Sequence, residues 1–120
     1  MTHKHAITHI EIPTTGTKES ARFFKEVFDW KTTDYPDMNY VVFEAEGGTG
    51  GGFSPVTEEN PIGNILLYIN TPNLEESLEK IRANGGEVLM ESFEIDGVGT
   101  MATFRDPSGN LLALLQPLME

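Results

Sequence analysis

The chain has 120 residues, of which 38% are hydrophobic, and this suffices for one compact domain with a core of its own. Eight basic and nineteen acidic residues give a formal net charge of −11, which repels phosphate backbones and makes nucleic acid an unexpected partner. The absence of cysteine excludes disulfides, thiolate nucleophiles and Cys-ligated metal or redox centres, so that His, carboxylate and carbonyl groups remain as metal ligands.

The start of the chain does not resemble an export signal. Residues 1–5 lack a long apolar region, and the longest uninterrupted apolar run, residues 111–115, is far too short to span a bilayer. We therefore expect a cytoplasmic protein with no membrane partner. His3 and His5 lie where chain ends usually fray, so we expect them in solvent and not at a metal.

Residues 8–13 alternate polar and apolar side chains, which predicts a strand. Ile10 and Ile12 then point to one face, as core residues do, and His9 and Glu11 point to the other. These two polar side chains lie about 7 Å apart along the strand, close enough to serve one small ligand or ion. A merely half-exposed polar face is the alternative interpretation of the same pair.

A turn and a helix follow this strand. Thr17 is the predicted N-cap, and the buried stripe of the helix is Ala21, Phe24 and Phe28, with Val27 beside it. Strands are predicted at residues 30–35, 38–46 and 53–56.

The glycine-rich segment 47–52 precedes the last of these strands. It lacks the Gly-Lys-Ser/Thr ending of a phosphate loop and no helix pattern follows it, so we reject a phosphate loop and expect a flexible or bulged connection into the strand. The polar segment 57–63 is the predicted linker to the second half.

The second half repeats the first. Residues 64–70 predict a strand, Asn73 caps a helix with a buried stripe of Leu74, Leu78 and Ile81, and residues 84–86 stop that helix. Three strands follow at 87–95, 100–105 and 110–116, with a type I turn at 106–109. A shift of fifty-seven positions superimposes four residues on four identical ones, Ile12, Thr14, Glu19 and Ser20 on Ile69, Thr71, Glu76 and Ser77. We therefore predict an α+β single domain of two βαβββ modules, about 6–56 and 64–117.

This order of elements resembles the vicinal oxygen chelate superfamily, which includes glyoxalase I, bleomycin-resistance proteins and extradiol dioxygenases. The resemblance covers nearly the whole chain and is most specific at Asp106-Pro107-Ser108-Gly109-Asn110, before the last strand. It implies that the two modules pair their sheets into a cupped half-barrel with the helices outside, and that the protein is a homodimer. It also implies a divalent metal in the cup that chelates neighbouring oxygens of the substrate.

Most of the metal-ligand positions that the resemblance implies are occupied by residues whose side chains are not usual metal ligands. His9 matches the first position, but its counterpart falls at Leu66, the last-strand carboxylate falls at Ala113, and the first module's last strand offers only Ser54. A catalytic divalent ion usually needs about three protein ligands, so we expect no metal and no other cofactor. The predicted metal-free cup is lined by His9, Glu11, Leu66, Tyr68, Leu111, Ala113 and Leu115.

Such a surface, mostly apolar with a few polar groups, favours a pocket for a small organic molecule, cationic or aromatic, as in the drug-sequestering branch of the family. The alternative is a lyase or isomerase of glyoxalase type, metal-dependent or His-based, in which His9 is the general base and Glu11 orients it. Tyr68 or Arg105 would then stabilise an oxyanion, although for Arg105 a salt bridge with Asp106 is the simpler expectation. A third interpretation is a structural or regulatory partner domain. Whether the chain is an enzyme stays open at this point.

Overall fold

The computed structural model of the chain describes residues 5–118. Within that range the chain forms two compact units, one of residues Thr8–Leu66 and one of the residues from Leu67 on together with those before Thr8. Each half has the order strand, helix, three strands, so the predicted α+β class with two βαβββ modules is confirmed. Neither α-helix of the described chain is long and apolar enough to cross a membrane.

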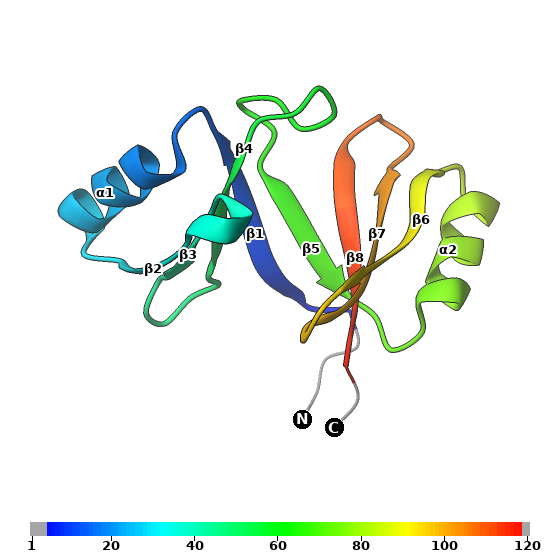
Figure 1. The fold of residues 1–120 in the computed structure, drawn as a ribbon. Coiled ribbons are helices and arrows are strands. Elements are labelled where there is room, and N and C mark those ends of the chain that lie inside the picture. Colours follow the sequence, from blue (N-terminus) through cyan, green and yellow to red (C-terminus); the bar gives the residue numbers. More distant parts are fainter. Residues whose placement is uncertain (1–4, 119–120) are drawn as a thin grey trace. The chain divides into compact units, whose positions relative to one another are not determined.

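The first module is a four-stranded sheet with one helix on one face (Figure 1). The strands lie in the order β2-β3-β4-β1, with β1 parallel to β4 and the other neighbours antiparallel. Helix α1 packs across β2, β3 and β4. The elements are β1 (Ile7–Thr14), α1 (Thr17–Phe28), β2 (Lys31–Tyr35), a short 3-10 helix η1 (Pro36–Met38), β3 (Tyr40–Glu44) and β4 (Gly51–Pro55).

The core of this module is aromatic and lies under α1. Phe53 is fully buried, and the ring of Trp30 stacks on Phe43 with 4.5 Å between centroids and on Phe24 with 4.9 Å. The predicted helix stripe is only partly right, because Phe28 and Val27 are more than half exposed. The reason is that α1 ends at Phe28, after which Trp30 supplies the ring that covers Phe43.

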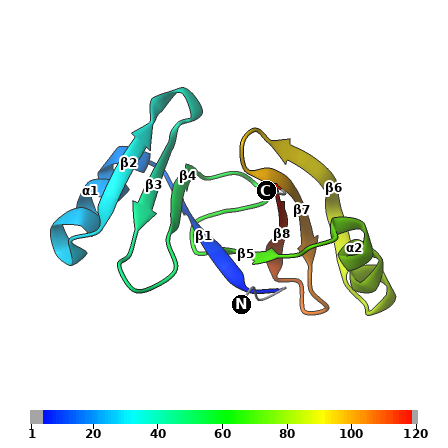
Figure 2. The ribbon, with the colours of Figure 1, turned by 90° about the horizontal axis from the view of Figure 1, so that it is seen from below.

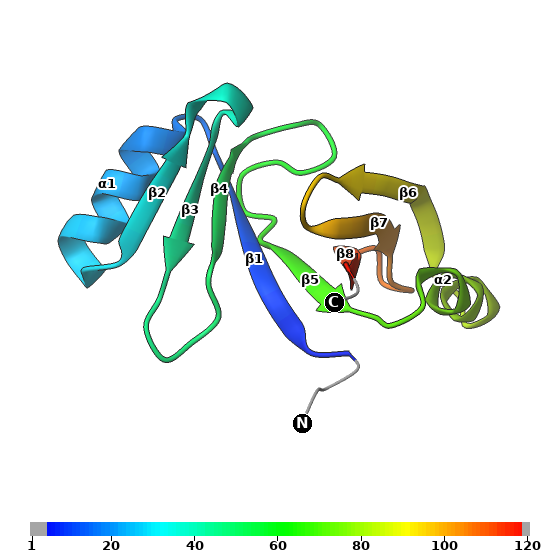
Figure 3. The same ribbon diagram turned by 60° about the horizontal axis from the view of Figure 1, so that its bottom comes forward.

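The second module repeats this plan. Its strand order is β5-β8-β7-β6, with β5 parallel to β8, and α2 packs against β6, β7 and β8 (Figure 2 and Figure 3). Leu74 and Leu78 are buried and Ile81 packs against them, so the predicted stripe of this helix is confirmed. The elements are β5 (Leu66–Asn70), α2 (Leu74–Ala83), β6 (Glu87–Ile95), β7 (Gly99–Arg105) and β8 (Leu111–Pro117).

The two helices begin with the same set of hydrogen bonds. Thr14 Oγ1 accepts from the backbone N–H two residues later at 3.0 Å and lies 2.6 Å from Ser20 Oγ. Thr71 Oγ1 does the same at 3.2 Å and lies 2.7 Å from Ser77 Oγ. Both threonines are buried. The fifty-seven-residue shift therefore superimposes residues with the same structural task, which is to fasten the end of a strand to the first turn of a helix.

The helix caps differ between the modules. Asn73 caps α2 as predicted, because its Oδ1 accepts from Glu76 N at 3.1 Å. The predicted cap Thr17 is wrong: Gly16 occupies the N-cap of α1, no side chain caps it, and Thr17 Oγ1 donates to Asn39 Oδ1 at 3.1 Å. The Thr14 hydroxyl, two residues before the cap, holds the turn instead.

The turn before β8 has the predicted form. Gly109 N donates to the carbonyl oxygen of Asp106 at 2.9 Å, and the Asp106 carboxylate accepts from Ser108 N, Asn110 N and Asn110 Nδ2. The expected salt bridge from Arg105 to Asp106 is wrong, since Arg105 Nη1 donates to Gly109 O at 3.0 Å. Hydrogen bonds from Asn110 thus lower the pKa of Asp106 without a cation beside it.

Candidate functional site

His9 and Glu11 lie on the face of β1 that is turned away from α1. Ile10 and Ile12, which alternate with them, pack against the aromatic core under the helix. Side chains alternate along a strand, so the opposite face is left to the imidazole and the carboxylate, as the sequence predicts. His9 is partly buried there.

The imidazole of His9 is bonded to a residue that sequence reasoning did not assign to the site. His9 Nε2 lies 2.7 Å from Tyr40 Oη, a distance typical of a strong hydrogen bond. The two ring planes differ by only 14° and the centroids are 6.5 Å apart, so the rings meet at their edges. Alternation along residues 40–44 does place Tyr40 on the face opposite the buried Val41. That signal identifies the face but not the partner.

Gly52 makes this contact available. Strand β4 lies between β3, which carries Tyr40, and β1, which carries His9. A Cβ atom at Gly52 would overlap the end of the Tyr40 ring, so the ring lies directly over this glycine. Gly52 is also the register partner of Glu11. Gly52 belongs to the glycine-rich segment that is not a phosphate loop. Because this residue has no side chain, the Tyr40 ring can lie across β4 and reach His9.

Burial sets the charge of this pair. Desolvation lowers the pKa of His9 from its ordinary value, because an apolar surrounding disfavours the imidazolium ion. At neutral pH the ring is therefore uncharged, with one nitrogen as donor and the other as acceptor. Tyr40 can either donate to Nε2 or accept from it, depending on the tautomer. The pair can thus offer a donor or an acceptor to a ligand, beside the carboxylate of Glu11.

The other predicted lining residues lie on β5 and β8. Tyr68 is the register partner of Ala113, and its hydroxyl contacts Met101 Sδ at 4.0 Å. These residues lie on the face of the second sheet turned away from α2, because Ile69 and Leu114 pack on the helix side. A cup that combines both sets of residues stays a prediction. The buried members are Leu66, Tyr68, Leu111 and Ala113, and Leu115 is half-buried.

The donor set does not fit the divalent metal that the resemblance implies. Leu66 and Ala113 carry no lone pair, and Nε2 of His9 is already within hydrogen-bond distance of Tyr40. Among residues 5–118 no group of three His, Cys, Asp or Glu side chains lies close enough together to hold a metal ion. A catalytic metal usually needs about three protein ligands, so the residues present do not fit the group.

Comparison with known proteins places these features in context. Residues 6–114 match the family model of the Glyoxalase/Bleomycin resistance protein/Dioxygenase superfamily. A glyoxylase-like domain-containing protein of Didymella fabae is 29% identical over 116 residues, covering 90% of this chain and 91% of that protein. The anthracycline biosynthesis protein DnrV of Streptomyces peucetius is 25% identical over 112 residues, covering 79% of this chain and 41% of that protein. The chain thus spans about two fifths of the length of DnrV.

Solved structures share the fold. A glyoxalase/bleomycin resistance protein/dioxygenase superfamily member from Vibrio splendidus 12B01 matches with a TM-score of 0.68 and 16% identity, covering 96% of this chain and all of that one. At this identity the likeness concerns the fold alone. It extends over both modules.

Proposed function

Because this chain belongs to the Glyoxalase/Bleomycin resistance protein/Dioxygenase superfamily, we propose that it binds a small organic molecule at His9 and Tyr40, without a divalent metal. The observation that carries the proposal is the 2.7 Å hydrogen bond between His9 Nε2 and Tyr40 Oη, on the sheet face turned away from α1. A polar pair fixed on a sheet face is the kind of group that orients a ligand against otherwise apolar walls.

The charges of the site and of the chain favour a neutral or cationic ligand. The imidazole is neutral at physiological pH, Glu11 contributes a carboxylate on the same face, and the whole chain carries a formal net charge of −11. An anion would meet this negative field without a cation on the strand to receive it. The name of the Streptomyces relative, which places that protein in the biosynthesis of anthracyclines, supports an organic ligand.

Screening by thermal unfolding tests the proposal directly. A ligand that binds only the folded chain adds about 2.7 kcal/mol at a concentration a hundred times its Kd. We expect stabilisers among neutral and cationic organic molecules, and we expect Tyr40→Phe and His9→Ala to lose most of the shift. Tyr35→Phe is the matched control, since it removes a phenolic hydroxyl from the neighbouring strand β2 and leaves His9 untouched. A complete screen without a stabiliser would contradict the proposal.

Metal content tests the second half of the proposal. The protein is exposed to Ni, Zn, Mn and Fe(II), and bound metal is measured by mass spectrometry. We expect either no stoichiometric metal or metal that disappears when His3 and His5 are replaced. Metal that is lost only in His9→Ala would show that the site has further ligands and would overturn the metal-free proposal.

A second candidate function is proton transfer in a lyase or isomerase, and Tyr40 is the observation that favours it. Sequence reasoning supplied His9 as a base but no conventional acid at a matched position, whereas Tyr40 lies 2.7 Å from that base. A hydrogen-bonded His–Tyr pair can move a proton between a carbon acid and a developing oxyanion. Turnover of the methylglyoxal–glutathione hemithioacetal that is lost in His9→Ala would support this function over simple binding.

We further propose that the chain is a homodimer, which rests on the family resemblance. Light scattering coupled to size exclusion should then give about twice the chain mass of 13.3 kDa. A mass of one chain at every concentration would contradict it.

A further inference from the structure

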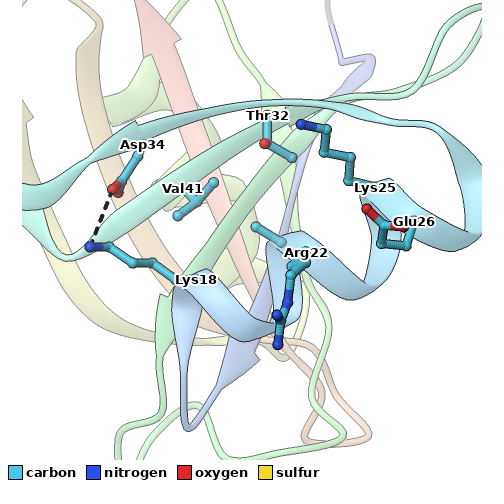
Figure 4. A pocket seen from close by; sticks show the side chains of 8 residues that line it. Lys18, Arg22, Lys25, Glu26, Thr32, Asp34 and Val41 are labelled. Atoms are coloured by element: carbon cyan, nitrogen blue, oxygen red, sulfur yellow. Dashed lines mark ion pairs between the residues drawn. The ribbon is translucent and has the colours of Figure 1, made fainter.

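The other side of the first sheet, which faces α1, carries a concave site. A hollow of about 320 Å³ opens between α1 and the strands β2 and β3, and five residues of the helix and three of the strands line it (Figure 4). Its floor includes Ala21 and Val41, both buried. His9 and Tyr40 lie on the opposite face of this sheet, so the hollow is distinct from the site described above.

The rim of the hollow is cationic in an otherwise acidic protein. Three of the chain's eight basic residues, Lys18, Arg22 and Lys25, line it, against two carboxylates, Glu26 and Asp34. Lys18 forms an ion pair with Asp34, with 3.8 Å between Nζ and Oδ2 (Figure 4). Over the described part of the chain, neither Arg22 nor Lys25 has a carboxylate within the 4.0 Å of an ion pair. Two cations therefore lie beside the hollow without an ion-pair partner among the described residues.

The second module shows that the common frame of the repeat does not require a cation at two of these three positions, since only Lys25 has a basic counterpart, Arg82. The hydrogen bonds of Thr14 and Thr71 fix the fifty-seven-residue register between α1 and α2. In that register Lys18 corresponds to Glu75 and Arg22 to Glu79, so the charge is reversed at both positions. The repeat therefore needs no basic residue there.

The residue at the floor differs in the same way. Ala21 corresponds in this register to Leu78, which is 2% exposed and belongs to the core under α2. The smaller Ala21 leaves room at the level of the helix that Leu78 fills. At the hollow, the first module thus has a smaller side chain, Ala21, and two basic residues, Lys18 and Arg22, where the second module has a leucine and two glutamates.

We propose that this hollow binds a small organic anion through its phosphate or carboxylate group. Lys25 lies toward the strand that carries Thr32, whose hydroxyl is a further donor (Figure 4). The Arg22 side chain points away from these two in this view, and once turned toward the hollow it offers a planar fork of donors that matches either oxyanion. The volume of about 320 Å³ lies at the lower end of small-molecule pockets and suits a compact ligand.

Titration of the ¹⁵N-labelled chain with inorganic pyrophosphate, and separately with citrate, tests the proposal by NMR. At low salt we expect the largest shifts in residues 18–26 and 31–34, and binding about tenfold weaker in the double variant Arg22→Gln, Lys25→Gln. Lys80→Gln is the matched control, because it removes an exposed cation from α2 and should leave binding unchanged. Response to pyrophosphate alone identifies a phosphate site, and response to citrate alone identifies a carboxylate site. Shifts spread evenly over all basic residues, or no shifts, would overturn the proposal.

A second variant tests the hollow without changing charge. Ala21→Leu places the residue of α2 in the corresponding position of α1 and should fill the space, so we expect anion binding to fall at least as far as in the charge variant. Its folding is checked by thermal unfolding of the same sample. Full binding by a folded Ala21→Leu protein would show that the cations act as a surface patch and that the hollow is not the site. His9→Ala should bind the anion normally, so failure here and failure of the proposed function are separate results.

Discussion

The imidazole of His9 is oriented by Tyr40 and kept neutral by its surroundings. Burial lowers the pKa of His9, and the hydrogen bond to Tyr40 Oη fixes one ring nitrogen. A histidine in this state recognises hydrogen-bonding groups without attracting anions. The two properties have separate consequences, one for the pH dependence of stability and one for packing.

The pH dependence follows from the direction of the His9 shift. The unfolded chain takes up a proton at His9 near its ordinary pKa of 6.5, whereas the folded chain does so only at lower pH. Stability is therefore unaffected by this group above that value and falls as the pH drops from 6.5 toward the folded-state pKa. Urea unfolding at several pH values between about 7.5 and 5 should show less loss of stability in His9→Gln than in the parent chain.

His5→Gln is the control for this prediction, because it removes an exposed histidine and leaves the pair with Tyr40 intact. The parent and His5→Gln curves should run parallel. If His9→Gln loses as much stability as the parent over this range, the shift of the His9 pKa is not the cause.

The packing of Tyr40 over Gly52 predicts that substitutions at the two positions are coupled. Gly52→Ala places a methyl group into the Tyr40 ring and should destabilise the chain by about 1–3 kcal/mol, the usual cost of overpacking. In a Tyr40→Ala background the ring is gone, and most of that cost should disappear. Urea unfolding of the two single variants and the double variant measures the coupling free energy. Strictly additive effects would mean that the ring does not lie over the glycine.

At the scale of elements, the shared threonine turn predicts matched effects in the two modules. Thr14→Val and Thr71→Val each remove a buried hydroxyl that accepts from a backbone N–H and bonds a serine of the following helix. Leaving those partners unsatisfied should cost about 1–3 kcal/mol at each position. Thr→Ser at the same positions keeps the hydroxyl and should recover most of it.

The readout for both positions is denaturant unfolding. The two costs should add in the double variant, because the residues belong to different units. A large effect in one module and none in the other would mean that the common hydrogen bonds are not the common source of stability.

The elements themselves were predictable because their signals are local. The strand at residues 8–13, the Asn73 cap and the turn at 106–109 each depend on residues within one turn or strand, and each appears in the structure. The cap of α1 was assigned wrongly to Thr17 because a hydroxyl two residues before the N-cap Gly16, at Thr14, can hold the turn equally well. A sequence pattern does not decide between such neighbours.

The partner of His9 was not predictable in the same way. Tyr40 is thirty-one positions away and reaches His9 only because β4 separates their strands and presents a glycine between them. Alternation gives the face of a strand but not the order of strands in the sheet. Predicting the hollow under α1 likewise requires the order of the strands in the sheet, because residues of α1, β2 and β3 line it.

At the scale of the whole molecule, charge repulsion should govern the response to salt. The chain carries a formal net charge of −11, and its ion pairs Lys18–Asp34 and Arg82–Glu91 both have exposed partners. Exposed pairs contribute little, so screening removes more repulsion than attraction. The screening length falls from about 30 Å at 0.01 M salt to about 10 Å at 0.1 M, so that repulsion between distant acidic residues is largely screened at the higher concentration.

We therefore expect the thermal midpoint at about pH 7.5 to rise by roughly 3–6 °C between these two sodium chloride concentrations, the shift that about 1 kcal/mol produces in a chain of this size. The control is the same pair of scans near the sequence pI of 4.5, where the net charge vanishes and the salt effect should shrink. A general effect of chloride on protein hydration would persist at that pH. A midpoint that falls with salt at pH 7.5 would instead mean that attractive contacts, such as those of Lys18 at the rim of the hollow, outweigh the repulsion of the acidic surface.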